Sequence, residues 1–301
     1  MSEVVWTQWD DLKVPEGWSL YSNALDTLSQ SELSTIDVYV PPYMSGAKGS
    51  QYIEKMPNLK VVQLLMAGFD DALGFMRDGQ TLCNARSVHD YSTAELAITF
   101  MLSHYRKFNN LRVDQNDNKW NHYRVGSLAE KRIGIIGAGS IANTLKSLLS
   151  NFPVEIELYG RSQRSGVYSM AALTERAPTL DVLVLLVPLT EETRGLIGAQ
   201  ELSLLKDGAL VINVARGPVI DSTALIAELA QERIYASLDV TDPEPLPSDS
   251  PLWQMKNCTI TPHTGGDSTA FEPRARKLIF EQLERISNGD ELINIIDWKS
   301  Q

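Results

Sequence analysis

Residues 132–145, RIGIIGAGSIANTL, constrain the fold of this chain more than any other stretch of it. A short apolar segment leads directly into Gly137-Ala138-Gly139-Ser140-Ile141-Ala142, and a segment that suits a helix follows. The first glycine permits a tight turn, the second lets a pyrophosphate approach the backbone, and the small third residue allows the helix to pack closely on the strand. The pattern therefore predicts a strand, a phosphate-binding loop at residues 137–141 and a helix whose N-terminus faces the phosphates.

Short apolar runs recur along the chain and alternate with longer stretches that suit helices. Many of the runs are continuous and rich in Val, Ile and Leu, which is typical of strands covered on both faces. The repeated alternation predicts an α/β fold with parallel sheets. The predicted strands include Val38–Val40, Leu59–Met66, Arg132–Ile136, Ile156–Tyr159, Val182–Val187, Ala209–Val214, Ala236–Val240 and Cys258–Thr261.

Two longer segments are predicted to be helices that join or flank domains. Ser92–Asn110 begins with a capping-box pattern, Ser92-Thr93-Ala94-Glu95, and Ser268–Ser287 carries apolar residues at helical spacing with Gly289 beyond. The polar stretch between Asn109 and Glu130 is predicted to be an irregular connection into a new domain.

Composition sets the class of protein and its partners. A length of 301 residues predicts about two domains, and 43% hydrophobic and 22% charged residues are typical of a soluble globular protein. The net charge of −11 disfavours general binding to nucleic acid or to an anionic membrane. Cys83 and Cys258 are too few for a disulfide framework and have no neighbours at metal-ligand spacing, and the N-terminus does not have the pattern of a signal peptide. We therefore expect a soluble, cytoplasmic protein without a metal site.

The strand after the phosphate loop indicates which dinucleotide is bound. An acidic residue at the end of this strand accepts hydrogen bonds from the ribose of NAD. The strand at Val154–Tyr159 is followed instead by Gly160-Arg161-Ser162-Gln163-Arg164. Because Arg161, Ser162 and Arg164 are suited to a 2′-phosphate, we predict that NADP is preferred and that NAD is the second option.

Three further runs are followed by polar residues at the edge where a parallel sheet builds its sites. They place Arg216, Glu244 and His263 just beyond VINVA, LDV and CTITP. With a nicotinamide cofactor implied, arginine is suited to hold a substrate carboxylate and polarise its carbonyl, and histidine is the usual proton donor at neutral pH. A carboxylate beside the histidine favours its protonated form. The set predicts reduction of a keto acid, with Glu244 supporting His263.

In these motifs the chain resembles the D-isomer-specific 2-hydroxyacid dehydrogenases, which include glyoxylate/hydroxypyruvate reductases and phosphoglycerate dehydrogenases. The resemblance runs from about Leu59 almost to the C-terminus. Its motifs, in family order, are LKVVQLLMAGFD, STAELAITFML, GIIGAGSIA, LVPLTEETRGLIG, LVINVARGPVID, LDVTDPEPL and TPHTGG.

The resemblance implies the same three catalytic roles and adds several binding residues. Ala67 and Gly68 would receive the substrate carboxylate through their backbone N–H groups, together with Arg216. Asp239 would contact the nicotinamide carboxamide, and Pro188 and Thr193 would line the ribose and adenine side of the cofactor.

The resemblance also implies two Rossmann-like domains with parallel sheets and a cleft between them. The discontinuous substrate domain would comprise residues 1–92 and 268–301, and the dinucleotide-binding domain residues 93–267. Members of this family commonly form dimers through the cofactor domain, so a homodimer is expected.

The chain departs from the family pattern in three places. Ala142 replaces the third glycine, the acid after the second strand is absent, and Asn84-Ala85-Arg86-Ser87 lacks the usual glycine and carries an extra arginine. Arg86 is predicted to be an exposed loop cation, with contact to a distal anionic group of the substrate as the alternative.

The motifs and the resemblance are compatible with three functions. The leading one is an NADPH-dependent reductase that forms a D-2-hydroxy acid from a small keto acid such as glyoxylate or hydroxypyruvate. The second is an NAD-dependent D-3-phosphoglycerate dehydrogenase, although many of these carry a C-terminal regulatory domain, which we do not expect for this chain. The third is a non-catalytic, dinucleotide-sensing corepressor, which the absence of disordered extensions disfavours.

Overall fold

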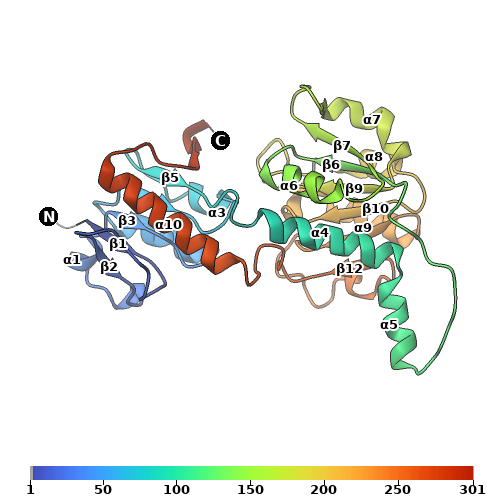
Figure 1. The fold of residues 1–301 in the computed structure, drawn as a ribbon, viewed down its shortest axis with the longest axis horizontal. Coiled ribbons are helices and arrows are strands. Elements are labelled where there is room, and N and C mark those ends of the chain that lie inside the picture. The colour runs from blue at the N-terminus through green and yellow to red at the C-terminus, as the bar shows by residue number, and fades with distance from the viewer. Residues whose placement is uncertain (1–2, 301) are drawn as a thin grey trace. The chain divides into compact units, whose positions relative to one another are not determined.

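The computed structural model describes residues 3–300, and the chain divides into two compact units (Figure 1). One unit comprises residues 1–89 and 269–301, and the other comprises residues 90–268. Each unit is built on its own largely parallel sheet, so the predicted α/β class is confirmed. The sequence placed the division at 92/93 and 267/268. Helix α4 begins at Asp90, so residues 90–92 belong to the second unit, and Ser268, which the sequence assigned to the first unit, belongs to the second as well.

The first unit has, within the described residues, a six-stranded sheet in the order β13-β5-β4-β3-β1-β2. The edge strand β13 pairs antiparallel with β5, whereas the other pairings are parallel. The strands are β1 Val4–Trp6, β2 Ser19–Tyr21, β3 Val38–Tyr39, β4 Val61–Gln63, β5 Thr81–Cys83 and β13 Ile295–Ile296.

Apolar residues cover both faces of this first sheet. Helix α10, Phe271–Asn288, packs Ala275, Ile279 and Leu283 against one face together with Val5. Val4 and Trp6 point to the opposite face, since neighbouring residues of a strand alternate between faces. The shorter helices of this unit are α1 Gln30–Leu33, α2 Gly46–Ser50 and α3 Asp70–Leu73.

The second unit has, across the part of the chain that the structure describes, a seven-stranded sheet in the order β12-β11-β10-β9-β6-β7-β8. The order runs outward from β6 in both directions, so the crevice at the carboxyl ends of β6 and β9 is the place where such a sheet binds a ligand. The strands are β6 Arg132–Ile136, β7 Glu155–Gly160, β8 Val167–Ser169, β9 Val182–Leu185, β10 Leu210–Asn213, β11 Tyr235–Leu238 and β12 Cys258–Ile260.

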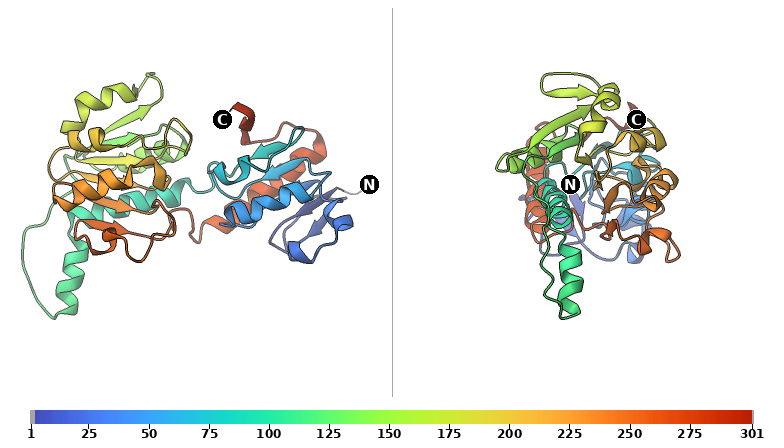
Figure 2. Two further views of the ribbon diagram at one scale, coloured as in Figure 1. Left: turned by 180° about the vertical axis from the view of Figure 1, so that it is seen from behind. Right: turned by 90° about the vertical axis from the view of Figure 1, so that its right-hand side faces the viewer.

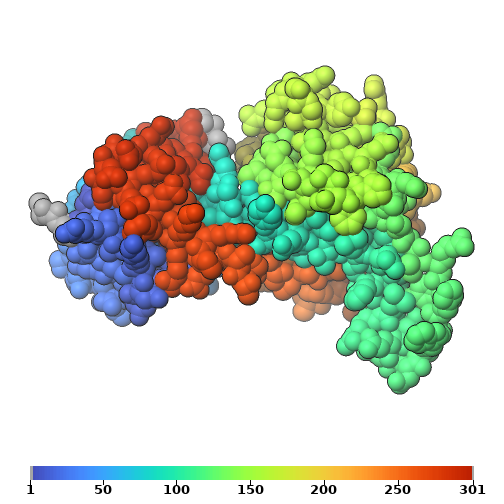
Figure 3. All heavy atoms as spheres, in the orientation of Figure 1, coloured from blue at the N-terminus to red at the C-terminus, as the bar shows by residue number. Residues whose placement is uncertain are grey.

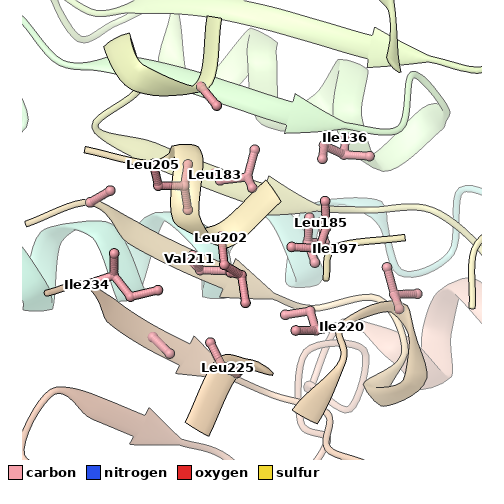
Figure 4. Packing of buried hydrophobic residues seen from close by; sticks show 14 of the residues in the cluster. Ile136, Leu183, Leu185, Ile197, Leu202, Leu205, Val211, Ile220, Leu225 and Ile234 are labelled. Carbon is pink, nitrogen blue, oxygen red and sulfur yellow. The ribbon is translucent and has the colours of Figure 1, made fainter. Parts of the chain in front are cut away.

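Helices lie on both faces of the second sheet, as the opposite views in Figures 1 and 2 show. Val182 and Val184 of β9 face α4 (Asp90–Tyr105) and α6 (Ser140–Leu149). Leu183 and Leu185 belong to the cluster on the other face, shown in Figure 4. That face is covered by α7 Leu173–Arg176, α8 Ala199–Leu204 and α9 Ser222–Ala230. The continuous apolar run of β9 is therefore explained by burial on both sides.

The predicted single helix Ser92–Asn110 is wrong in its extent. Helix α4 ends at Tyr105, and a second helix, α5, occupies Phe108–Asn116, most of which lies in the stretch predicted to be irregular. Lys107 has φ 53°, a left-handed conformation that interrupts the helix. The helix also begins two residues before the proposed cap at Ser92, because Asp90 already starts its first turn. Within the described residues, no helix is long and apolar enough to cross a membrane.

A buried carboxylate on β7 links the sheet to α7. Glu157, whose side chain is 7% exposed, accepts hydrogen bonds from Tyr159 Oη (2.6 Å), Arg176 Nε (2.8 Å) and Arg132 Nη2 (2.7 Å). The hydrogen bond from Arg176 is the largest cause that lowers the pKa of Glu157 from 4.5 to about 2, against the effect of burial. Ionised Glu157 is thus favoured in the folded protein.

Replacing Glu157 with glutamine is expected to lower the free energy of unfolding at pH 7 by about 3 kcal/mol. Because the pKa is lowered on folding, this contribution is fully present above the unfolded pKa near 4.5 and is lost as the pH falls towards 2. Urea unfolding of wild type and E157Q at pH 7 and pH 3 measures the effect, with Glu175→Gln, at an exposed position of α7, as control. Equal stability of E157Q and wild type at pH 7 would contradict the prediction.

Candidate active site

The phosphate loop has the geometry that its sequence predicts. Gly137 has φ 111°, and a Cβ at this position would lie 2.7 Å from the carbonyl oxygen of Leu186, so only glycine fits the turn. Gly139 is the N-cap of α6, and it has open space within 4 Å where a side chain would lie, as judged against the described residues. The N–H groups of the first turn of α6, at Ser140 and Ile141, are therefore available to a phosphate.

A pocket of about 380 Å³ lies beside this loop, at the carboxyl ends of β6, β7 and β9. Seven of the residues predicted to bind the cofactor line it: Gly137, Ala138, Gly139, Arg161, Arg164, Pro188 and Thr193. Tyr159, Met170, Leu186 and Leu196 add apolar surface suited to a flat ring. Ser140, Ile141 and Ser162 adjoin lining residues in the chain without lining the pocket themselves. The glycine-rich loop, the N-terminus of α6 and the two arginines together suit a dinucleotide.

The loop after β9 is held by its own side chains. Thr193 Oγ1 donates to the carbonyl of Pro188 (2.6 Å) and accepts from the N–H of Thr190 (2.8 Å). This loop also carries Glu192, which lines the pocket and pairs with Arg161, with Oε2 3.1 Å from Nε. Sequence reasoning did not identify Glu192. The TEE run after a predicted strand indicated acidic residues at the edge of a parallel sheet that binds ligands, but it did not indicate a contact with Arg161.

His263 and Glu244 form a close pair beyond the ends of β12 and β11. Nδ1 of His263 lies 2.6 Å from Oε1 of Glu244, with the side chains 25% and 40% exposed. Burial works to raise the pKa of Glu244, but the hydrogen bond and charge of His263 and the charge of Arg216 outweigh it, so the pKa lies below 4.5. Glu244 is therefore a carboxylate near neutral pH, and its contact at Nδ1 leaves Nε2 as the other proton-carrying atom of the ring.

Asp239 organises the loop that carries His263. Its carboxylate accepts from the hydroxyl of Thr261 (2.5 Å) and from the N–H groups of Thr264 and Gly265 (2.8 Å each). Its own carbonyl accepts from the N–H of His263 at 2.8 Å. His263 has φ 54°, a conformation that is uncommon outside glycine and that these contacts hold in place. The resemblance gave Asp239 a contact with the cofactor, which stays a prediction.

Arg216 follows β10 and lies close to the Glu244 loop. Asn213 Nδ2 donates to the Arg216 carbonyl (2.9 Å), and Arg216 Nη1 donates to the carbonyl of Ala215 (2.9 Å). A Cβ at Gly217 would collide with the backbone carbonyl of Thr241, so glycine is required where the two loops touch. Sequence reasoning treated Gly217 only as part of a motif. The structure thus brings Arg216, Glu244 and His263 to one edge of the second sheet.

Ala67 and Gly68 belong to the first unit, in the loop after β4. Buried Asn84 donates from Nδ2 to the carbonyl of Ala67 (2.7 Å), and the N–H of Ala85 donates to the carbonyl of Met66 (2.8 Å). Asn84 thereby fixes the loop predicted to receive a carboxylate, a role that sequence reasoning missed. Arg86 is exposed, as predicted, and its backbone bonds to Asn84 and Asn294.

Known proteins are similar to this chain in sequence and in fold. The family model for the D-isomer specific 2-hydroxyacid dehydrogenase, NAD binding domain, matches residues 98–265. A D-3-phosphoglycerate dehydrogenase from Methanocaldococcus jannaschii is 30% identical over 265 residues, which are 84% of this chain. The matched region is only 50% of that protein, so this chain spans about half the length of that relative.

Solved structures match over nearly the whole chain. A D-isomer specific 2-hydroxyacid dehydrogenase from Xanthobacter autotrophicus, in complex with NADPH and MES, is 27% identical with a TM-score of 0.80, and 99% of each chain is covered. An NADPH-dependent glyoxylate/hydroxypyruvate reductase from Sinorhizobium meliloti, in complex with NADP and sulfate, is 25% identical with a TM-score of 0.84, again with 99% of each chain covered. The family model spans more than half of this chain. The chain therefore belongs to the D-isomer specific 2-hydroxyacid dehydrogenases, which are NAD(P)-dependent oxidoreductases.

Proposed function

We propose that this protein uses NADPH to reduce a small 2-keto acid, of the glyoxylate or hydroxypyruvate type, to the D-2-hydroxy acid. The observation that carries the proposal is the His263–Glu244 pair (2.6 Å) beside Arg216, on the same sheet edge as a nucleotide pocket that contains two arginines. The Sinorhizobium reductase, whose chain is covered almost completely, has this activity by its description.

The protonated imidazole of His263 is the proton donor in this proposal. Glu244 accepts the hydrogen bond at Nδ1, which fixes the ring and compensates its positive charge. Nε2 is then free to give its proton to the substrate oxygen as negative charge develops there. The bound nicotinamide supplies the hydride. In the opposite direction, neutral His263 takes the proton back from the hydroxyl group.

Arg216 and the loop at Ala67 and Gly68 bind the substrate in this proposal. The forked guanidinium of Arg216 holds the carboxylate and polarises the neighbouring carbonyl. The backbone N–H groups of Ala67 and Gly68 receive the carboxylate, and Asn84 keeps their loop in shape through the Ala67 carbonyl. Asp239 combines a contact to the nicotinamide carboxamide with its hold on the His263 loop.

The cofactor preference rests on the end of β7. Arg161 and Arg164 line the pocket, and the chain has tyrosine and glycine where an acid would accept the ribose hydroxyls of NAD. We infer that both arginines bind the 2′-phosphate of NADPH. The remaining binding residues surround the pyrophosphate, ribose and adenine: Gly137, Ala138, Gly139, Ser140, Ile141, Ser162, Pro188 and Thr193.

Removal of both arginines tests the cofactor preference. The variant R161A/R164A is expected to raise the KM for NADPH about tenfold or more, because charge-assisted hydrogen bonds to phosphate are lost, and to change the KM for NADH by less than about twofold. Initial rates with glyoxylate and hydroxypyruvate at varied cofactor concentrations measure both values. The proposal fails if the wild type prefers NADH or turns over neither keto acid.

A second candidate function is D-3-phosphoglycerate dehydrogenase with NAD. The relative from Methanocaldococcus jannaschii, 30% identical to this chain, favours it. Oxidation of 3-phosphoglycerate with NAD at a rate above that of keto acid reduction with NADPH would decide for this function.

We further propose a homodimer formed through α5 and the chain that follows it. This segment projects from the second unit in Figures 1 and 3, and it carries exposed Phe108 (64%), Val113 (58%) and Trp120 (98%). Such apolar side chains on one projecting element are typical of a protein interface. Light scattering is expected to give twice the mass of the chain for the wild type and a monomer for Val113→Asp. A monomeric wild type at micromolar concentration would contradict the dimer.

A further inference from the structure

Arg161 already has a partner of opposite charge in the pocket where a 2′-phosphate would lie. Its Nε is 3.1 Å from Oε2 of Glu192, and both residues line the same pocket. The two residues lie in different loops: Arg161 is in the loop after β7, and Glu192 is in the loop after β9. Both side chains are largely exposed, at 81% and 67%. Among the described residues that line this pocket, Glu192 is the acidic one.

The position of Glu192 is set by its loop. Thr193 ties the loop together through the Pro188 carbonyl and the Thr190 N–H, and the N–H of Arg194 donates to the carbonyl of Thr190 at 3.0 Å. Glu192 thus lies in a turn that is held by hydrogen bonds on both sides of it, next to Arg161. Glu191, the residue before it, is also exposed but does not line the pocket.

A carboxylate in this place acts differently on the two cofactors. A 2′-phosphate must compete with Glu192 for Arg161, and it meets a like charge in the same pocket. A 2′-hydroxyl carries no charge and loses nothing from the pairing of Arg161 with Glu192. We propose that Glu192 is a specificity-determining residue that weakens binding of the 2′-phosphate and so limits the preference for NADPH over NADH.

The inference rests on the proposed NADPH preference, and binding of nucleotide fragments tests it without turnover. Titration calorimetry compares 2′,5′-ADP with 5′-AMP, which differ only in the 2′-phosphate. Glu192→Gln is expected to bind 2′,5′-ADP about two- to fivefold more tightly than wild type, the range typical of exposed ion pairs, and to bind 5′-AMP within about 1.5-fold of wild type. The gain is expected to shrink at high salt, because ions screen exposed charges.

Two further variants make the result specific. Glu191→Gln removes the same charge from the neighbouring position and is expected to leave the affinity for 2′,5′-ADP unchanged. Addition of E192Q to Arg161→Ala is expected to tighten 2′,5′-ADP less than E192Q does in the wild type, because the competition for Arg161 is gone.

Unchanged affinity of E192Q for 2′,5′-ADP, or an equal gain in E191Q or for 5′-AMP, would overturn the role of Glu192. If wild type discriminates between the two nucleotides and R161A does not, the NADPH preference stands even when Glu192 fails. If wild type binds both nucleotides with equal affinity and R161A changes neither affinity, the proposed preference for NADPH is wrong. The proposed role of Glu192 is then wrong as well.

Discussion

Replacing His263 with glutamine is expected to lower kcat for keto acid reduction by about 10²- to 10⁴-fold, the contribution typical of a general acid. Glutamine has a similar size and can still donate a hydrogen bond to Glu244, but its neutral amide has no acidic proton to transfer to the substrate. Because the nucleotide pocket lies beyond β6, β7 and β9, whereas His263 follows β12, the affinity for NADPH is expected to change by less than about threefold. Steady-state rates and fluorescence titration of NADPH measure the two quantities.

Glu244→Gln is the matched variant for the partner of His263. It is expected to lower kcat less than H263Q does, since the proton donor remains and only its support is lost. The pKa of Glu244 lies below 4.5, so the carboxylate stays charged as the pH falls to that value. Wild type is therefore expected to have a higher kcat than E244Q at pH 7 and at pH 5, and this difference is expected to disappear only below pH 4.5.

If H263Q retains a kcat within a few fold of wild type, His263 is not the proton donor.

The second unit could be predicted well from the sequence because its strands are buried on both faces. The segment Arg132–Ile136 was predicted with the bounds that β6 has in the structure, and β9, β10 and β12 fall inside their predicted runs. Strands β6, β9 and β10 are largely apolar and buried, which distinguishes them from the helices around them, whereas β12 is a partly buried edge strand. Local sequence was sufficient where the strand is central and hydrophobic.

Three short edge strands were not predicted, because they lack that signal, and the three-residue interior strands β1 and β5 were not named either. Strands β2, β8 and β13 have two or three residues at the edges of their sheets, and Val167–Ser169 alternates with exposed Tyr168. Such strands are determined by pairing with a neighbour far along the chain, as Ile295 pairs with Cys83. The break at Lys107 was missed for a related reason, since the sequence around it suits a helix and carries neither glycine nor proline.

The candidate site was predictable as residue types and much less so as contacts. The order of Arg216, Glu244 and His263 after apolar runs indicated a shared edge of the sheet, and the structure places Glu244 and His263 in contact. Neither spacing nor composition indicated that Glu192 would reach Arg161, because the two residues are 31 positions apart and meet only through the sheet order β9-β6-β7. Contacts of this kind depend on topology rather than on local sequence.

Replacing Arg216 with glutamine is expected to lower kcat/KM by about 10²- to 10³-fold, comparable to the loss of one group that stabilises developing negative charge. In the proposed mechanism Arg216 acts on both the carboxylate and the carbonyl, so KM should rise and kcat should fall. Arg216→Lys keeps the charge but loses the planar fork, and it is expected to fall between wild type and R216Q. Arg194→Gln, at an exposed position outside the site, controls for loss of a positive charge.

Two measurements separate a role in substrate binding from a role in folding. Arg216 donates to the Ala215 carbonyl and precedes Gly217, so a structural role would lower the melting temperature of both R216Q and R216K. A role in binding the substrate predicts instead that both variants unfold within a few degrees of wild type and bind NADPH normally, while only R216K retains part of its kcat/KM. If R216Q keeps kcat/KM within a few fold of wild type, the carboxylate and the carbonyl must be bound by other groups, and the backbone N–H groups of Ala67 and Gly68 become the first alternative.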